Sequence, residues 1–201
     1  TWFEKTVNIT HNDTRDAILK KNLLMQKDER FDVFLAAENE RLIRDLSFIS
    51  DARFIAMPVE GADSTDLILM VQDKMPLGIE AEISKTGITA IGITHQNMFG
   101  IGHQLSFRSY IDALNTPRFG YMATYGTPNL FRSFTAFRIG YVDKWNQNSL
   151  LLNVNRDFRA MSIKSAGGFN FERTNAIRNL SLIDTTEFFL STEFNDLVCF
   201  F

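Results

Sequence analysis

Apolar and polar residues alternate strictly along most of the second half of the chain. In the stretch 149–157, Leu152 and Val154 share one parity, whereas Asn153 and Asn155 share the other. A period of two predicts β-strands with one apolar and one polar face. Short connections between such stretches predict an antiparallel meander. We expect strands at 78–95, 103–112, 118–126, 133–144, 149–158 and 163–173, with one or two more in the tail 185–201.

This alternation fits either a soluble sandwich or a membrane-spanning β-barrel, because both wet one face and bury the other. Two features favour the barrel. The polar parity holds Arg, Asn, Glu and Gly, which is typical of a barrel lumen. The second feature is that aromatic residues gather near the expected strand ends, as in an interfacial girdle: Phe99, Tyr110, Tyr125, Phe131, Phe134 and Trp145. No stretch approaches the ~20 apolar residues of a membrane helix.

The first 76 residues mix helical and strand patterns. Asp13 or Thr14 can cap a helix that runs to about Met25. Asp32 can cap a second helix, through about Leu46, in which apolar residues recur on one face. Strands are expected at 2–10, 47–59 and 66–74. The last of these is a nearly continuous apolar run, which predicts a central strand covered on both faces.

Composition and motifs argue against several classes of function. The chain has 201 residues with 21 basic and 24 acidic side chains, so it lacks the basic surplus of a nucleic-acid binder. Cys199 is the single cysteine, which excludes an internal disulfide. His95 and His103 flank a glycine turn but lack a third metal ligand. We therefore expect no enzyme activity, no catalytic residue, no metal and no cofactor. Gly100 and Gly102 lack the third glycine and the following helix of a dinucleotide site, so they predict a tight turn.

Several stretches, taken in order, resemble the BamA/TamA-type outer-membrane barrel family, whose members carry polypeptide-transport-associated (POTRA) domains. The region from DTRDAILKK to LILMVQDK resembles a POTRA domain. ITHQNMFGIGHQLSF is similar to the family's N-L-F-G-x-G hairpin, YGTPNLFRSF to its Y-x-x-P-N turn, and VNRDF to its R-P-F strand end. Two departures are Leu46-Ser47-Phe48 in place of Gly-Tyr-Phe, and Asp157 in place of the proline.

The resemblance implies a two-part fold. Residues 1–76 would form an α+β POTRA domain with the order β-α-α-β-β. Residues 77–201 would form the N-terminal part of an antiparallel transmembrane β-barrel. The family barrel has sixteen strands, so the chain is expected to be a fragment that contains about half of one.

The same resemblance implies three functional segments. Unfolded clients would add a strand to the edge of the second POTRA strand, and Ile55→Pro is expected to remove a ladder donor on that strand and to impair client binding. The barrel seam would lie at the first barrel strand, where a glycine weakens the strand. The first hairpin turn would follow it. The residues are Arg53, Phe54, Ile55, Ala56 and Met57 for the client edge; Gly87, Ile88, Ile91, Gly92 and Ile93 for the seam; and Phe99, Gly100 and Gly102 for the turn.

The implied function is assembly of β-barrel proteins in, or translocation of proteins across, a Gram-negative outer membrane, with the POTRA domain in the periplasm. The implied partners are unfolded outer-membrane clients, outer-membrane lipids and accessory lipoproteins, with no nucleic acid. Two family alternatives stay open: the POTRA-barrel module of a patatin-like lipase autotransporter, and a two-partner secretion transporter. An unrelated soluble α+β protein with a β-meander is the fourth hypothesis.

Overall fold

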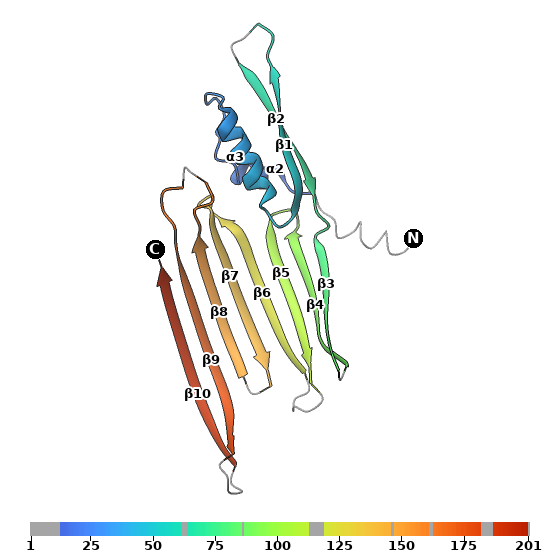
Figure 1. Ribbon diagram of the computed structural model, residues 1–201, viewed down its shortest axis with the longest axis vertical. Coiled ribbons are helices and arrows are strands. Elements are labelled where there is room, and N and C mark those ends of the chain that lie inside the picture. The colour runs from blue at the N-terminus through green and yellow to red at the C-terminus, as the bar shows by residue number, and fades with distance from the viewer. Residues whose placement is uncertain are drawn as a thin grey trace, which may run out of the picture.

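The chain folds into an α/β unit followed by a long antiparallel sheet (Figure 1). The computed structural model describes residues 13–61, 64–85, 87–112, 119–145, 147–160, 163–181 and 187–200. The α/β unit contains α2 (Asp16–Lys21), α3 (Val33–Arg44), β1 (Ile49–Pro58) and β2 (Thr65–Asp73). The strand expected at 2–10 lies outside the described residues.

The two helices begin close to where the sequence predicts them, but only α3 has the predicted length. The Asp32 carboxylate accepts the N–H groups of Phe34 (2.8 Å) and Leu35 (3.5 Å), which caps α3 as expected. Helix α2 was expected to reach Met25 but ends at Lys21. It ends early because the fully buried Asn39 accepts the N–H of Leu24 (2.6 Å) and so holds the following segment in a non-helical path.

The core of the α/β unit lies between the helices and the β1–β2 hairpin. Its centre is Phe48, which is 1% exposed and lies just before β1. The buried core residues are Ile43, Leu46, Phe48, Ile49 and Ala52, and the apolar residues packed around them are Ile18, Leu19, Leu23, Leu69 and Val71. All of these come from α2, α3, β1, β2 and the segments beside them, so the unit has a core of its own.

The predicted β-α-α-β-β POTRA arrangement was wrong. Over the described residues, two helices are followed by β1 and β2, which pair only with each other in a two-stranded sheet. Strand β2 is not the doubly covered central strand that its apolar run predicts. Leu69 and Val71 pack on the core, but Ile68 and Met70 on the opposite face are 47% and 56% exposed. The apolar run therefore reflects one buried face and one exposed apolar face.

The remaining strands form one eight-stranded sheet in which every strand pairs antiparallel with its neighbours in sequence. Figure 1 shows them side by side in chain order, with β3 and β10 at the two sides. Among the described residues the sheet is open, because β3 and β10 each pair on one side only. Its strands are β3 (Leu77–Ser84), β4 (Gly87–Met98), β5 (His103–Ile111), β6 (Phe119–Leu130), β7 (Thr135–Lys144), β8 (Gln147–Arg156), β9 (Gly167–Ser181) and β10 (Glu187–Phe200).

The stretch 78–95, predicted as one strand, is two. Strand β3 ends at Ser84 and β4 begins at Gly87, and the two pair as a hairpin in which Gly78 lies opposite Thr94. The break falls between Ser84 and Gly87, which pair with each other and are residue types favoured at the two ends of a turn. The alternation continues on either side of it, so periodicity alone did not show the reversal.

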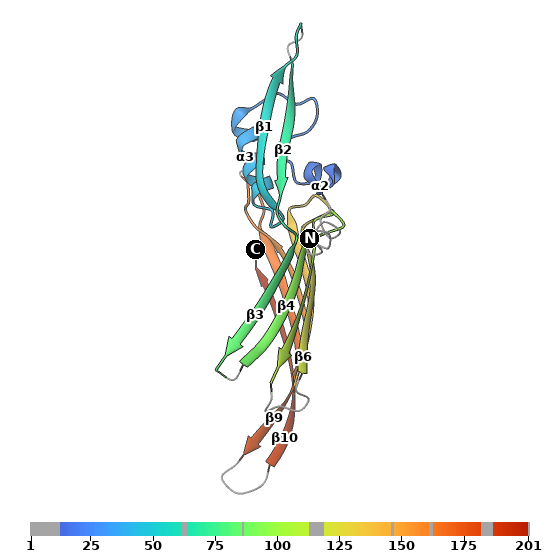
Figure 2. The same ribbon diagram turned by 90° about the vertical axis from the view of Figure 1, so that its right-hand side faces the viewer.

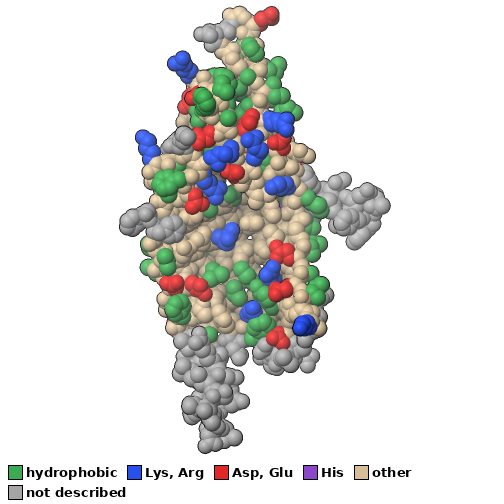
Figure 3. Space-filling model, viewed as in Figure 1, with side chains coloured by type: hydrophobic (Ala, Val, Ile, Leu, Met, Phe, Trp, Pro, Cys, Tyr) green, Lys and Arg blue, Asp and Glu red, His purple; other side chains and the backbone are tan. Residues whose placement is uncertain are grey.

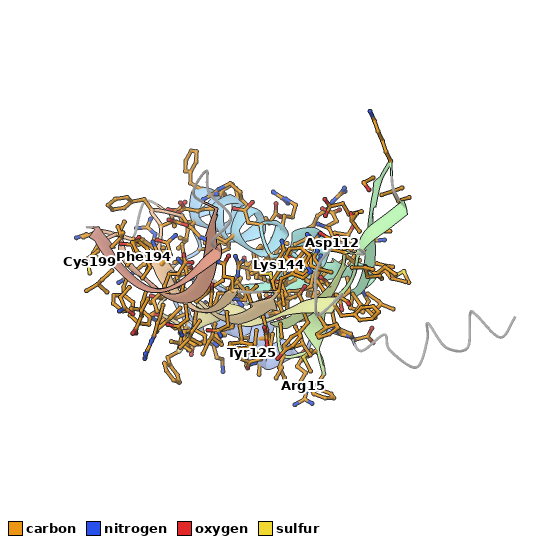
Figure 4. All side chains as sticks on the ribbon, turned by 90° about the horizontal axis from the view of Figure 1, so that it is seen from below. Arg15, Asp112, Tyr125, Lys144, Phe194 and Cys199 are labelled. Carbon is orange, nitrogen blue, oxygen red and sulfur yellow. The ribbon has the colours of Figure 1, made fainter. Side chains whose placement is uncertain are left out.

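The two faces of the sheet differ as the alternation predicts. On the outer, convex face, Ile93, Phe107, Ala123, Tyr141 and Leu150 lie side by side across five strands. Seven large apolar residues of this face are 38–46% exposed, so no described part of the chain covers them fully: Leu105, Phe107, Tyr121, Tyr125, Ile139, Tyr141 and Leu150. Figure 4 shows Tyr125 outside the curve of the sheet, whereas Lys144 lies within it.

The inner, concave face is polar and small. Thr94 donates to Ser106 (2.9 Å), and the hydroxyls of Ser149 and Thr174 lie 2.7 Å apart. Figure 3 views this face, where acidic and basic side chains are spread among backbone and small residues. Among the described residues, neither helix is long and apolar enough to cross a membrane.

The α/β unit is seated on one end of the sheet, where the β4–β5, β6–β7 and β8–β9 connections lie. Leu42 of α3 packs against Ala160 and Ile163 of the β8–β9 connection, together with Phe134 of the β6–β7 turn. Arg41 donates to the backbone carbonyl of Arg159. Figure 2 shows α3 and α2 on opposite sides at this end of the sheet, so the rim of the sheet lies between them.

Candidate functional site

The predicted client edge, residues 53–57, lies in the middle of β1. One edge of β1 pairs with β2, with Ile55 opposite Ile68, and in the described part of the chain no strand pairs with the other edge. On the face turned away from the core, Ile55 and Met57 are 45% and 51% exposed. The structure thus places these residues on a strand with one open side, and whether a client binds there stays a prediction.

Backbone polar groups on the open edge of β1 come from alternate residues. The N–H of Phe54 donates to Glu40 on α3 (2.7 Å), so it points away from β2. In an antiparallel ladder the two backbone groups of a residue point to the same side, and successive residues alternate. Ala52, Phe54 and Ala56 therefore face the open edge. Ile55 faces β2, so Ile55→Pro removes a donor from the β1–β2 ladder and not from the open edge, and its effect on client binding stays a prediction.

The predicted seam strand is not at an edge. Gly87, Ile88, Ile91, Gly92 and Ile93 lie on β4, and β4 pairs with β3 on one side and β5 on the other. The unpredicted break at residues 84–87 supplies an additional strand, so the edge of the sheet is β3. The side chains of Gly87 and Ile88 lie outside the described part of the structure.

Gly92 lies on the inner face, where its lack of a side chain leaves space above the backbone. Arg108 of β5 reaches over Gly92 to form an ion pair with Glu80 of β3. A Cβ at Gly92 would lie 3.5 Å from Arg108 Nε and 3.6 Å from Glu80 Cβ, so a longer side chain would occupy the path of the ion pair. The ion pair therefore connects the edge strand β3 to the second strand inward.

The predicted hairpin turn joins β4 to β5, which makes it the second hairpin of the sheet and not the first. Phe99, Gly100 and Gly102 have φ of 53°, 69° and 71°. A Cβ on Gly100 would overlap the backbone carbonyl of Asp13, and one on Gly102 would lie 3.1 Å from the Phe48 ring. The glycines are needed both for left-handed backbone and for close packing against the α/β unit.

Asn97 organises this first turn, residues 97–102. It is 3% exposed, and its Oδ1 accepts the N–H of Gly102 (2.7 Å). Its Nδ2 donates to Thr14 Oγ1 (2.8 Å). Thr14 in turn donates its N–H (2.6 Å) and its hydroxyl (2.9 Å) to the carboxylate of Asp73, the last residue of β2. One side-chain amide thereby connects the turn, the segment before α2 and the end of β2.

The β6–β7 turn, residues 129–134, repeats this arrangement. Asn129 is 2% exposed and accepts the N–H of the residue five positions later, Phe134 (2.9 Å). Phe131, Arg132 and Phe134 have φ of 51°, 61° and 54°, in the same positions after the asparagine as in the first turn. The two turns, NMFGIG and NLFRSF, therefore share one conformation although only the first has glycines.

The second turn holds the other end of α2. Asn129 Nδ2 donates to Asn22 Oδ1 (2.9 Å) and to the carbonyl of Lys21 (3.2 Å). Burial lowers the pKa of the Lys21 ammonium from its usual value, since this end of the helix is packed against the turn. The first turn holds Thr14 and the N–H of Arg15, which donates to the Gly100 carbonyl (3.0 Å). The six-residue helix is thus fixed at both ends by two copies of one turn.

Alanine substitutions at Gly100 and Gly61 can separate the cost of left-handed backbone from the cost of close packing against the α/β unit. Gly61 also has a left-handed φ, +80°, but its Cβ would meet nothing within 4 Å. We expect Gly61→Ala to cost only the left-handed strain, about 1–2 kcal/mol. Gly100→Ala should cost more because it also displaces the Asp13 carbonyl. The measurement is the loss of hydrogen-exchange protection in α2, compared between the two variants. If Gly61→Ala and Gly100→Ala reduce this protection equally, packing of Gly100 against the α/β unit is unimportant.

Alanine at each turn asparagine should release one end of α2. Asn97→Ala leaves the Gly102 N–H without its acceptor and should cost about 1–3 kcal/mol. We expect faster amide exchange at Arg15 and Gly102, with little change at Phe134. Asn129→Ala should give the reverse pattern, with faster exchange at Phe134. Identical patterns in the two variants would contradict independent anchoring of the helix ends.

The described residues contain no group of three or more His, Cys, Asp or Glu side chains that could hold a metal ion. The chemistry that the structure does present is backbone hydrogen bonding at strand edges and apolar contact on the outer face. Backbone groups on an open strand edge are the kind with which an extended polypeptide can pair.

Sequence reasoning missed the buried asparagines and the α3 residues that contact β1. Glu40 and Arg44 were not singled out from the sequence, because nothing in their spacing points to a strand edge. Asn97 and Asn129 carried a usable signal, because Asn-x-Phe occurs at the end of two expected strands. Comparing the two turns with each other would have identified the repeat.

Comparison with known proteins places the fold. No protein-family model and no curated protein matches the chain. Among solved structures, the chain is similar to BamA from Haemophilus ducreyi lacking POTRA domains 1–3, with a TM-score of 0.57 and 13% sequence identity. The chain has the fold of part of a BamA barrel. The match covers 92% of this chain and 40% of that chain, so this chain spans less than half the length of its structural relative.

Proposed function

We propose that this chain belongs to an outer-membrane protein that assembles β-barrel proteins or translocates polypeptides. The observation that carries the proposal is the open antiparallel sheet with an uncovered apolar outer face, a polar inner face and the fold of a BamA barrel segment. An outward apolar band and a polar interior are what a lipid-spanning barrel requires. The sheet would lie in the outer membrane, with the α/β unit in the periplasm.

The proposed partners follow from the exposed surfaces. Outer-membrane lipids would contact the apolar band of the sheet. Unfolded outer-membrane clients would pair with open strand edges, because pairing through backbone groups is nearly independent of client sequence. Accessory lipoproteins are further expected partners. Neither the lipase-linked module nor the two-partner transporter is favoured by a particular observation in the structure.

Two adjacent residues of β8 test the membrane assignment. Leu152 lies on the outer face between Ile139 and Phe171, whereas Leu151 lies on the inner face between Gly140 and Glu172. Leu152→Lys should destabilise the inserted protein by about 2–4 kcal/mol if this face meets the bilayer centre. Leu151→Lys should be tolerated, since a cation there can approach Glu172. The readout is heat-modifiable migration after folding into lipid vesicles.

Two results would contradict the membrane assignment. One is a parent protein that lacks heat-modifiable migration and stays dissolved without detergent. The other is equal tolerance of lysine at Leu151 and Leu152, because only a lipid-facing position imposes a large cost on a charge.

Proline at Ala56 tests the client edge. Ala56→Pro removes an N–H that faces the open side of β1 and leaves the β1–β2 ladder intact. We expect weaker photocrosslinking of a denatured outer-membrane barrel protein to β1. The matched control is Thr65→Pro, at the first residue of β2, opposite Pro58, where the N–H faces the other edge of the hairpin. Unchanged crosslinking in Ala56→Pro would show that clients do not use this edge.

A further inference from the structure

Side chains of α3 occupy the first half of the open edge of β1. Glu40 accepts the Phe54 N–H (2.7 Å), and Arg44 donates to the Ala52 carbonyl (2.6 Å). The Ala52 N–H is taken by the side chain of Asp51 (2.9 Å). Glu40 and Arg44 are one helical turn apart and also form an ion pair with each other (3.4 Å). The pair thus supplies an acceptor and a donor where a neighbouring strand would supply them.

The second half of this edge is different. Ala56 faces the same side as Ala52 and Phe54, and among the described residues none forms a hydrogen bond to its N–H or its carbonyl. Pro58, the next residue on this side, has a carbonyl but no N–H. The exposed side chains of Ile55 and Met57 flank Ala56. A peptide backbone can therefore pair here without displacing a protein group.

We propose that Glu40 and Arg44 form a side-chain gate that confines strand addition on β1 to the segment beyond Phe54, from Ile55 to Pro58. The inference rests on the proposed function and assigns the register of its client edge. The occupant is an extended polypeptide with alternating apolar side chains, because Ile55 and Met57 present an apolar surface beside the open backbone groups. Pairing beside Ala52 and Phe54 requires displacement of two charge-assisted hydrogen bonds, which are stronger than neutral ones.

Crosslinking at three positions of one face tests the gate. Arg53, Ile55 and Met57 all point away from the core and are exposed. A photoreactive residue is placed at each in turn in the whole polypeptide, and the probe is a peptide with the sequence of residues 149–156. In the parent we expect crosslinks at 55 and 57, and on the order of tenfold fewer at 53, where pairing must displace the gate. In Glu40→Ala/Arg44→Ala, crosslinking at 53 should rise to the level at 57.

The matched control is Arg41→Ala/Asp45→Ala, which removes a second ion pair at α3 (3.0 Å) and the Arg41 hydrogen bond to the Arg159 carbonyl, and leaves the gate in place. Its crosslinking at 53 should stay low. Glu40→Gln keeps an acceptor oxygen for the Phe54 N–H and should behave as the parent does. Hydrogen exchange at the Phe54 amide provides an independent readout. Added peptide should protect this amide in the double alanine variant but leave its exchange unchanged in the parent.

The possible failures are distinguishable. Equal crosslinking at 53 and 57 in the parent overturns the gate and leaves strand addition at β1 standing. A rise at 53 in the Arg41→Ala/Asp45→Ala control also overturns the gate, because a general loosening of α3 would then explain it. Absence of crosslinks at all three positions in every variant overturns the client edge itself. If the double alanine variant loses its fold, parent exchange at Phe54 decides: protection by added peptide contradicts the gate.

Discussion

Two buried side-chain amides, those of Asn97 and Asn129, connect the α/β unit to the sheet. Each amide accepts a backbone N–H of its own turn and donates to a group at one end of α2. A buried polar group left without a partner costs about 1–3 kcal/mol, so each amide favours one arrangement of turn and helix together. Strands β4 to β7 carry these turns, and α2 packs into the core of the α/β unit. These hydrogen bonds position α2 on the sheet, and the contact of α3 with the β8–β9 connection positions the other side of the unit.

The two turns have the same backbone conformation, but the free-energy cost of the left-handed residues differs between them. Glycine occupies two of the three left-handed positions in the first turn, whereas Arg132 and Phe134 occupy them in the second. Left-handed backbone costs a residue with a side chain roughly 1–2 kcal/mol. Phe134 offsets part of this cost, because its ring packs with Leu42 and Ile163 in the contact between α3 and the β8–β9 connection. The first turn needs glycine because Asp13 and Phe48 leave no room for a side chain. In the second turn, the Phe134 side chain forms part of the contact between α3 and the β8–β9 connection.

Much of the sheet was predictable from the sequence, because alternation is a local property that tertiary contacts rarely override. The faces of β5, β7, β8 and β9 follow the parity of their residues, and the Asp32 cap follows from its position before an amphipathic run. The break at Ser84 was not predictable by periodicity, since the alternation continues on both sides of it, although Ser84 and Gly87 at the two ends of the turn are residues that turns favour. The partners of Asn97, Glu40 and Arg44 are distant in sequence or lie on another element. Their roles depend on tertiary placement, which no local pattern encodes, and the POTRA prediction failed for the same reason.

This fold has open strand edges, and a different set of side-chain contacts is found on each of them. An unpaired edge promotes uncontrolled association, so natural sheets cover or charge it. On β1, charged side chains of α3 bond to the backbone of the first half of the edge. On β3, Glu80 is connected over Gly92 to Arg108, two strands inward. On β10, Glu193 pairs with Arg173 of β9 (2.7 Å). On β3 and β10, side chains thus form ion pairs with other strands of the sheet. On β1, side chains form hydrogen bonds with the backbone of the edge.

A side chain bonded to an edge backbone group restricts where a new strand can pair. An ion pair that leaves the edge backbone open does not. Under the proposed gate, β1 is therefore the edge on which the protein would define the register of an added strand.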